Sequence, residues 1–287
     1  MLYELFSWLD TAFDFPGAGA FEYISTRTGL AAVTSVIISL IIGRRIIKWL
    51  SSMQLKEVIR EDIGLDHHQA KAGTPSMGGV IILLAVIIPS ILFMKMDSVY
   101  AWLIVFVIIA LGLVGFVDDY IKVVKKDKSG LAGRFKMVGQ VGVGIVVGAV
   151  LYFHPDFADV NTLSTVPFLK NVNIDYAFFG EDLGWMIFIP VAVFVITAVS
   201  NATNLTDGLD GLASGVSAIC GFVFAIFAYV SGRTDLSGYL DIMYLPGAGE
   251  LTIFCAALIG GCMGFLWYNT NPASVFMGDT GSLALGP

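Results

Sequence analysis

The sequence predicts an all-α protein built as a polytopic bundle of membrane-spanning helices. Only 14% of its 287 residues are charged and 56% are hydrophobic, whereas a soluble domain carries about 25% charged residues. The hydrophobic residues also gather in runs of roughly 17–25 residues, the length that an α-helix needs to cross a bilayer. Because the chain shows no internal repeat, low-complexity stretch or second domain, we expect residues 1–287 to form a single transmembrane domain.

Seven apolar runs are long enough to span the membrane, and an eighth begins near Ser282. The seven lie at about Tyr23–Ile42, Met77–Met94, Tyr100–Val117, Met137–Phe153, Leu183–Val199, Leu212–Tyr229 and Leu251–Tyr268. Residues 1–20 mix aromatic and acidic side chains, which suits a short interfacial helix. They show no basic segment followed by a cleavage pattern, so we expect no removable signal peptide.

The distribution of basic residues predicts the orientation of the chain. Twelve of the 16 Lys and Arg residues fall in the segments that follow the first and third runs, and such segments usually lie in the cytoplasm. The N-terminus is therefore expected outside, and the cytoplasmic segments are expected at about 43–76, 118–136, 200–211 and 269–281. No charged residue or His lies in the core of any run, which counts against an ion-coupled transporter. We expect the lipid bilayer, and no nucleic acid, among the partners.

The densest polar stretch, Asn201–Gly211, lies between the fifth and sixth runs. Its glycines allow the backbone to approach a ligand closely. If the stretch opens a helix, Asp207 and Asp210 share one face of the first turn because they are three residues apart. The alternative is a helix cap with Asn204 or Thr206 at the N-cap, although a cap needs only one such residue.

Asp118 and Asp119 end the third run, and Lys122 follows one turn later. Two adjacent carboxylates repel each other, and the dipole at a helix C-terminus disfavours anions. A bound divalent cation removes both objections, and carboxylate oxygens are suited to Mg²⁺ that bridges to substrate phosphates. The alternative is a solvated helix end without a ligand.

Two further polar segments flank the second and eighth runs. Asp279 is expected just before the eighth helix, either as an N-cap or as a metal ligand. Phe276 is expected in a cytoplasmic loop, where its ring could stack on a planar base or pack under the loop. Thr74 resembles an N-cap with Pro75 as the first helical residue, and Lys71 lies beside that helix N-terminus, which is a ready anion site.

Together these segments predict a site for a diphosphate at the inner membrane face. The second, fourth, sixth and eighth runs all begin on the cytoplasmic side, so the positive ends of their dipoles converge there. Lys71, Lys122 and Lys136 add positive charge beside the acids. The residues therefore indicate Mg²⁺-dependent phosphoryl transfer.

Four segments carry a resemblance to a known family. They read KAGTPSMGG at 71–79, GFVDDYIKVVKK at 115–126, NATNLTDGLDGLA at 201–213 and NPASVFMGDTGSLALG at 271–286. The chain resembles the polyprenyl-phosphate N-acetylhexosamine-1-phosphate transferase superfamily, and within it the phospho-N-acetylmuramoyl-pentapeptide transferase (translocase I) family. The paired Asp and the Gly-Asp near the end are shared across the superfamily, whereas GTPSMGG and NLTDGLDGLA favour the muramoyl branch.

The resemblance implies transfer of phospho-N-acetylmuramoyl-pentapeptide from UDP-MurNAc-pentapeptide to undecaprenyl phosphate in the bacterial inner membrane. The products are lipid I and UMP, in the first membrane step of peptidoglycan synthesis. Asp279 resembles the metal ligand of the family, and Asp118 and Asp119 resemble its catalytic pair, all three within reach of the metal. The remaining residues resemble those of the uridine pocket and the adjoining cleft, namely Lys71, Asp210, Asn269, Phe276, Asn204 and Asp207.

An alternative within the superfamily is a UDP-N-acetylglucosamine-1-phosphate transferase of another cell-envelope pathway. The family carries ten spans and a His-rich cytoplasmic loop, and this chain ends before both. We therefore expect a chain that is truncated at its C-terminus. Residues 1–287 alone are expected to insert into the membrane but to transfer no phospho-sugar. The sequence does not specify the oligomeric state, and a homodimer is one possible assembly.

Overall fold

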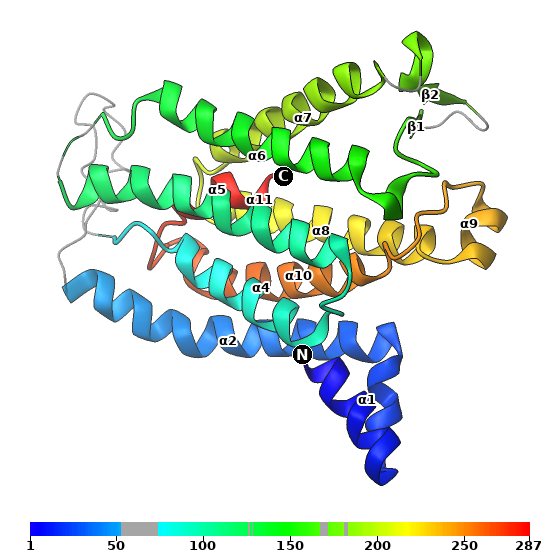
Figure 1. Cartoon of the computed structure of the whole chain (residues 1–287). Coiled ribbons are helices and arrows are strands. Elements are labelled where there is room, and N and C mark those ends of the chain that lie inside the picture. The colour runs from blue at the N-terminus through cyan, green and yellow to red at the C-terminus, as the bar shows by residue number, and fades with distance from the viewer. Residues whose placement is uncertain (53–73, 126, 128, 167–171, 181–182) are drawn as a thin grey trace.

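Long helices laid side by side form nearly all of the protein (Figure 1). The structure, a computed structural model, describes residues 1–52, 74–125, 127, 129–166, 172–180 and 183–287. The α-helices are α1 (Leu2–Phe13), α2 (Ile24–Ser52), α4 (Gly79–Phe93), α5 (Val99–Val123), α6 (Gly133–Phe153), α7 (Trp185–Thr206), α8 (Leu212–Ser231), α9 (Thr234–Leu240), α10 (Glu250–Asn269) and α11 (Asp279–Leu285). Shorter elements are the 3-10 helices η1 (Ala18–Glu22), η2 (Pro155–Phe157) and η3 (Tyr176–Phe179), and the antiparallel strands β1 (Leu163–Thr165) and β2 (Asn173–Asp175).

Every predicted apolar run forms a helix, so the predicted helical membrane fold is confirmed. Within the described residues, six helices are long and apolar enough to cross a membrane: α2, α5, α6, α7, α8 and α10. The second run forms the shorter apolar helix α4, of 15 residues. Consecutive long helices run in opposite directions (Figure 1), so the described parts of the segments predicted to be cytoplasmic lie at one end of the bundle.

The prediction that α4 begins at Pro75 is wrong. Residues 75–78 instead lie alongside the segment that precedes α11. The amide of Phe276 donates to the carbonyl oxygen of Pro75 at 2.9 Å, and the amide of Gly78 donates to that of Phe276 at 2.8 Å. These tertiary bonds satisfy backbone groups that a first helical turn would otherwise leave without partners. Thr74 is therefore not an N-cap, and the helix begins at Gly79.

The centre of the bundle is α10, the most buried of the six spans. It packs closely on α2 because small residues line the contact. A Cβ atom added to Gly264 would lie 2.6 Å from the Cβ of Ser39, and a Cβ added to Gly260 would overlap the carbonyl oxygen of Ala32. Such small residues allow two membrane helices to approach each other.

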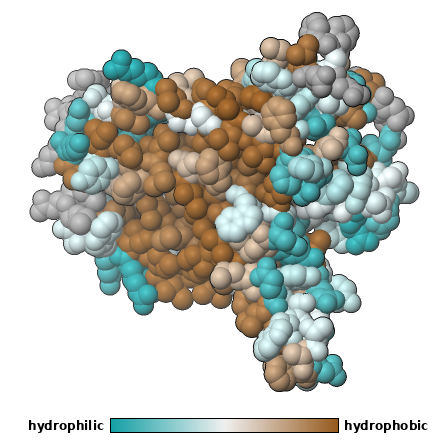
Figure 2. Space-filling view, in the orientation of Figure 1, coloured by the Kyte–Doolittle hydropathy of each residue, from teal (hydrophilic) through white to brown (hydrophobic). Residues whose placement is uncertain are grey.

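The outer surface has the polarity of a membrane protein. A broad hydrophobic band covers the middle of the molecule, and hydrophilic residues gather towards its two ends (Figure 2). Five of the six spans are buried over less than half of their apolar window, and α7 over only 11%. Large exposed side chains such as Phe194 and Phe222 lie on these helices. The exposed band is explained by contact with lipid rather than with water.

A buried ion pair fixes the opposite end of the bundle. The guanidinium of Arg27 in α2 donates to both carboxylate oxygens of Glu250 in α10, at 2.7 and 2.8 Å, and to the carbonyl oxygen of Phe93 at 3.0 Å. The same carboxylate accepts the amide of Lys95 at 2.8 Å. These bonds join α2, α4 and α10 at the end of the bundle where the predicted external segments lie. No pattern in the sequence predicted this pairing.

Candidate active site

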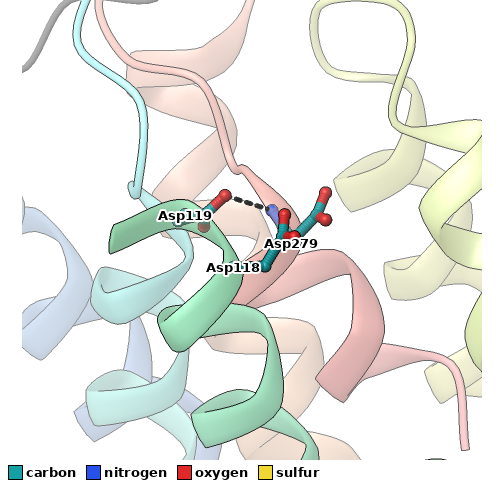
Figure 3. Close-up of side chains that lie close together, drawn as sticks. All are labelled: Asp118, Asp119 and Asp279. Atoms are coloured by element: carbon teal, nitrogen blue, oxygen red, sulfur yellow. Dashed lines mark hydrogen bonds between the residues drawn. The ribbon is translucent and has the colours of Figure 1, made fainter. Parts of the chain in front are cut away.

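Three carboxylates from two helices meet at the predicted cytoplasmic end of the bundle. Asp118 and Asp119 come from α5, and Asp279 is the first residue of α11 (Figure 3). One oxygen atom of each lies within 4.8 Å of those of the other two. Asp118 and Asp119 are buried, and Asp279 is half-buried. The structure therefore brings Asp279 beside two adjacent acids, of which Asp119 lies 160 residues earlier in the chain.

The paired acids lie inside α5 and not at its end, which corrects the sequence-based prediction. The helix continues for another turn to Val123. It can continue because both carboxylates have partners from other parts of the chain. Asp118 Oδ1 accepts the amide of Leu131 at 2.8 Å, and Asp118 also receives two lysine side chains. These contacts partly offset the repulsion between the two carboxylates, from which a bound cation was predicted.

Asp119 holds the beginning of α11. Its Oδ1 accepts the amide of Asp279 at 3.1 Å, and its Oδ2 accepts the amide and hydroxyl of Thr280 at 2.8 and 2.6 Å. The first amides of a helix have no partner within the helix, and a carboxylate there also interacts favourably with the dipole. Asp119 therefore positions the backbone that carries Asp279.

A glycine permits the close approach of α5 and α11. A Cβ atom added to Gly115 would overlap the backbone carbonyl oxygen of Asp279 and lie 2.7 Å from the Cα of Thr280. Gly278, just before α11, has φ +74°, a conformation that side-chain-bearing residues rarely adopt. The two glycines explain why this helix start can lie directly on α5.

Lys122 and Lys136 bridge Asp118 and Asp279. The ammonium group of Lys122 lies 2.5 Å from Asp118 Oδ2 and 3.2 Å from Asp279 Oδ2. That of Lys136, in the first turn of α6, lies 3.0 Å from Asp118 Oδ1 and 2.5 Å from Asp279 Oδ2. Among the described residues, three carboxylates thus face two ammonium groups, which leaves net negative charge for a cation to compensate.

Asn204 reaches the cluster from the last turn of α7. Its side-chain amide donates to Asp279 Oδ1 at 2.9 Å and to the Ser282 hydroxyl at 2.8 Å. The prediction that this stretch opens a helix, or that Asn204 caps one, is wrong because α7 continues through Thr206 and α8 begins only at Leu212.

Asp207 and Asp210 lie in the short connection between α7 and α8, where both are half-buried. They therefore do not share the first turn of a helix. Gly211 ends the connection in a left-handed conformation, with φ +76°. The amide of Gly211 donates to Asn269 Oδ1 at 3.0 Å, and Asn269 Nδ2 donates to the carbonyl oxygen of Val275 at 2.9 Å. Asn269 is buried and ties two connections together.

The remaining predicted residues lie around this end of the bundle. Phe276 is half-buried, between the exposed ring that could stack on a base and the ring packed under the loop, the two alternatives that the sequence left open. The Thr74 hydroxyl lies 3.5 Å from the carbonyl oxygen of Ala273, a long hydrogen bond. Lys71 lies outside the described residues, as does the rest of 53–73.

A buried polar chain that sequence reasoning missed supports the site from behind. Asn201 donates to Gln140 at 2.8 Å, Gln140 to the Ser200 hydroxyl at 3.2 Å, and Ser200 to the carbonyl oxygen of Leu283 at 2.9 Å. The chain links α6, α7 and α11. The sequence feature that could have indicated this chain is Gln140, a single amide side chain within an apolar run.

The donor set fits a hard divalent cation. Such ions prefer carboxylate oxygens, and Mg²⁺ in particular binds through one or two carboxylates together with substrate phosphates. Among the described residues, the oxygens of Asp118 and Asp279 contact two lysine ammonium groups, the amide of Leu131 and the side-chain amide of Asn204. Both oxygens of Asp119 instead accept hydrogen bonds from the start of α11. Carboxylates and ammonium groups at one membrane end can together bind a metal and a diphosphate.

Comparisons with known proteins agree with this chemistry. Residues 101–287 match the family described as glycosyl transferase family 4, and residues 71–83 match the phospho-N-acetylmuramoyl-pentapeptide-transferase signature 1. A phospho-N-acetylmuramoyl-pentapeptide-transferase of Flavobacterium psychrophilum is 48% identical over all of this chain and 78% of its own length. Proteins of the same name from Salinibacter ruber and Parabacteroides distasonis are 50% and 48% identical, again over the whole chain and over 76% and 75% of their lengths. The chain therefore belongs to the phospho-N-acetylmuramoyl-pentapeptide-transferase family.

Proposed function

We propose that this protein transfers phospho-N-acetylmuramoyl-pentapeptide from UDP-MurNAc-pentapeptide to undecaprenyl phosphate. An oxygen of the lipid phosphate attacks the sugar-linked phosphorus, the bond from that phosphorus to the oxygen bridging the two phosphates breaks, and UMP leaves. The product is lipid I, an intermediate of peptidoglycan synthesis in the bacterial inner membrane. The proposal is carried by the carboxylate and lysine cluster at one end of the spans, in a chain whose relatives bear this activity in their name.

The arrangement supports a division of roles among the charged residues. Asp118 and Asp279 are the proposed ligands of Mg²⁺, which when bound neutralises charge on the transferring phosphate. Lys122 and Lys136 already contact both carboxylates and are proposed to contact the diphosphate. Asp119 is proposed to act by holding α11 in place, because both its oxygens accept hydrogen bonds from the residues that begin α11.

A general base is not required for the attack. The second pKa of a phosphate monoester is about 6, so the lipid phosphate is largely dianionic at neutral pH. Positioning and charge neutralisation then account for most of the catalysis, as in other phosphoryl transfers. The geometry favours this reading over proton abstraction, because each oxygen of Asp118 already lies close to an ammonium group.

The contacts of the uridine are proposed from family resemblance. Lys71, Asp210 and Phe276 are assigned to the base and ribose, and Asp207 and Asn204 to the adjoining cleft. Asn269 is assigned an indirect role, since its amide already joins Gly211 to Val275. Thr74 is also assigned to the substrate site, because it lies beside the 270–278 connection that carries Phe276.

The donor specificity is tested by comparing two UDP-sugars. With undecaprenyl phosphate as acceptor, we expect lipid-linked product from UDP-MurNAc-pentapeptide at a rate at least tenfold above that from UDP-N-acetylglucosamine. The comparison is made on the chain extended to the length of its relatives, of which residues 1–287 cover 78% in the Flavobacterium psychrophilum protein. A faster reaction with UDP-N-acetylglucosamine would assign the chain to the alternative branch.

We propose that the N-terminus and the 232–249 connection face the outside and that the carboxylate cluster faces the cytoplasm. The distribution of Lys and Arg supports this orientation. After replacement of the native Cys residues, Ser129→Cys should resist a membrane-impermeant thiol reagent added to intact cells, and Gly238→Cys should react. Both positions are exposed, and a Cβ at Gly238 meets no other atom within 4 Å. Reaction at position 129 from outside would reverse the orientation.

A further inference from the structure

A cavity lies between α2 and α10, at the same end of the bundle as the carboxylates. Its volume is about 500 Å³, and it is lined by Leu40, Ile41, Arg44, Arg45 and Trp267. None of these residues takes part in the carboxylate cluster. The cavity combines two guanidinium groups with two aliphatic side chains and one indole ring. The proposed transfer reaction assigns no role to these residues.

The close contact of the two helices creates this cavity. Gly43 faces the ring of Tyr268, so closely that an added Cβ would lie 2.5 Å from the ring. The Tyr268 hydroxyl donates to the carbonyl oxygen of Leu40 at 2.7 Å, which fixes the ring. Neighbouring residues on each helix, Arg44 and Trp267, are therefore turned towards the sides of the contact and flank it.

The surface leading to the cavity has the shape and polarity of a lipid site. On α2, Ile37 and Ile41 are four residues apart and 49% and 51% exposed, and on α10, Met263 and Trp267 are four apart and 56% and 71% exposed. Residues four apart share a helix face, so each helix presents an apolar stripe towards the bilayer. On α2, Arg44 and Arg45 continue this stripe by one turn.

The two guanidinium groups are available to a ligand. Arg44 and Arg45 are exposed, and within the part of the chain that the structure describes neither forms an ion pair or a side-chain hydrogen bond. A guanidinium group offers a planar set of donors that matches phosphate. A Trp ring is typical of the headgroup level of a membrane, so Trp267 indicates the depth of the cavity.

We propose that this cavity binds the phosphate group of an anionic phospholipid from the surrounding bilayer. Arg44 and Arg45 donate to the phosphate, and the acyl chains lie along the two apolar stripes. A zwitterionic lipid is disfavoured because its own cationic group is repelled by two guanidinium groups, whereas basic pockets between membrane helices favour anionic headgroups. The proposal rests on the membrane fold and is independent of the transfer reaction.

The test uses Trp267 as a fluorescent reporter in the purified chain. The other four of the five Trp residues are replaced by Phe, and quenching is titrated with brominated phosphatidylglycerol and with brominated phosphatidylcholine. Each basic residue near a membrane surface contributes about 1 kcal/mol towards anionic lipid. We therefore expect phosphatidylglycerol to quench at a concentration about 10- to 30-fold lower than phosphatidylcholine.

Two variants separate the cavity from general charge attraction. Arg44→Gln with Arg45→Gln should reduce this preference to less than about threefold, with an unchanged circular dichroism spectrum. The matched control is Arg134→Gln, which removes an exposed Arg that lies over the Phe135 ring in α6 and outside the cavity. This control should retain the full preference.

Three results would overturn the proposal. The first is equal quenching by the two lipids, and the second is an equal loss of preference in the Arg134→Gln control. The third is displacement of phosphatidylglycerol by undecaprenyl phosphate at equimolar amounts, which would assign the cavity to the lipid substrate.

Discussion

Asp279→Asn is expected to lower the transfer rate by about 10²–10³-fold or more while the chain still folds and inserts, because charge stabilisation of a transferring phosphoryl group typically has that magnitude. The carboxylate of Asp279 contacts Lys122, Lys136 and Asn204. Asn keeps the shape of the side chain but removes its negative charge. The variant should therefore lose affinity for a divalent cation and leave the two lysines without one of their shared partners.

The measurement has one arm that requires no catalysis. Binding of Mn²⁺, as a spectroscopic substitute for Mg²⁺, is followed by electron paramagnetic resonance on the purified 287-residue chain. Turnover is measured on the chain extended to the length of its relatives. Asp127→Asn is the matched control, because Asp127 lies in the neighbouring connection and is exposed, and among the described residues its carboxylate accepts hydrogen bonds only from Ser129. Normal Mn²⁺ affinity in Asp279→Asn would show that the metal assignment is wrong.

Hydropathy was sufficient to predict the seven apolar helices but not their polar ends. The seven apolar runs correspond to α2, α4, α5, α6, α7, α8 and α10. The ends of α5 and α7 were placed too early because Asp118 and Asn204 are polar, yet both remain helical. Each is held by partners distant in the sequence, Lys136 and Asp279 among them. A local pattern contains no information about such partners.

The meeting of the three acids could be predicted, whereas their supporting contacts could not. An alternating topology is enough to bring Asp118 and Asp279 to one membrane end. The cap that Asp119 provides for α11 depends on the docking of one helix start on another, which the sequence does not specify. The ion pair of Arg27 with Glu250, 223 residues apart, was missed for the same reason.

Gly115→Ala is expected to disrupt the site without altering any charged residue. The new Cβ would overlap the carbonyl oxygen of Asp279 and press on Thr280, so α11 must move away from α5. Both contacts are backbone atoms, which cannot turn aside. Overpacking of this kind costs about 1–3 kcal/mol, and a displacement of about 1 Å in catalytic groups can lower a rate about 10²-fold. Loss of the Asp119 cap should follow.

Two further glycines provide matched controls for this expectation. A Cβ at Gly112, one turn earlier in α5, would meet Leu83 Cδ1 at 2.7 Å, the end of a flexible side chain, and a Cβ at Gly142 in α6 meets no atom within 4 Å. Ala is favoured over Gly within a helix by about 1 kcal/mol, so Gly142→Ala should be neutral or stabilising. Gly112→Ala should have a mild effect.

The readouts for the three variants are thermal unfolding and Mn²⁺ binding. We expect Mn²⁺ affinity to fall more than about tenfold in Gly115→Ala, because the substitution displaces α11 and with it the carboxylate of Asp279. This loss of affinity should be larger than the loss of thermal stability. The Gly112→Ala and Gly142→Ala variants should retain affinity within a factor of about two, as expected when no backbone atom must move. If Gly115→Ala binds Mn²⁺ as tightly as Gly142→Ala, the contact of α5 with the start of α11 does not position Asp279, and the role assigned to Asp119 fails with it.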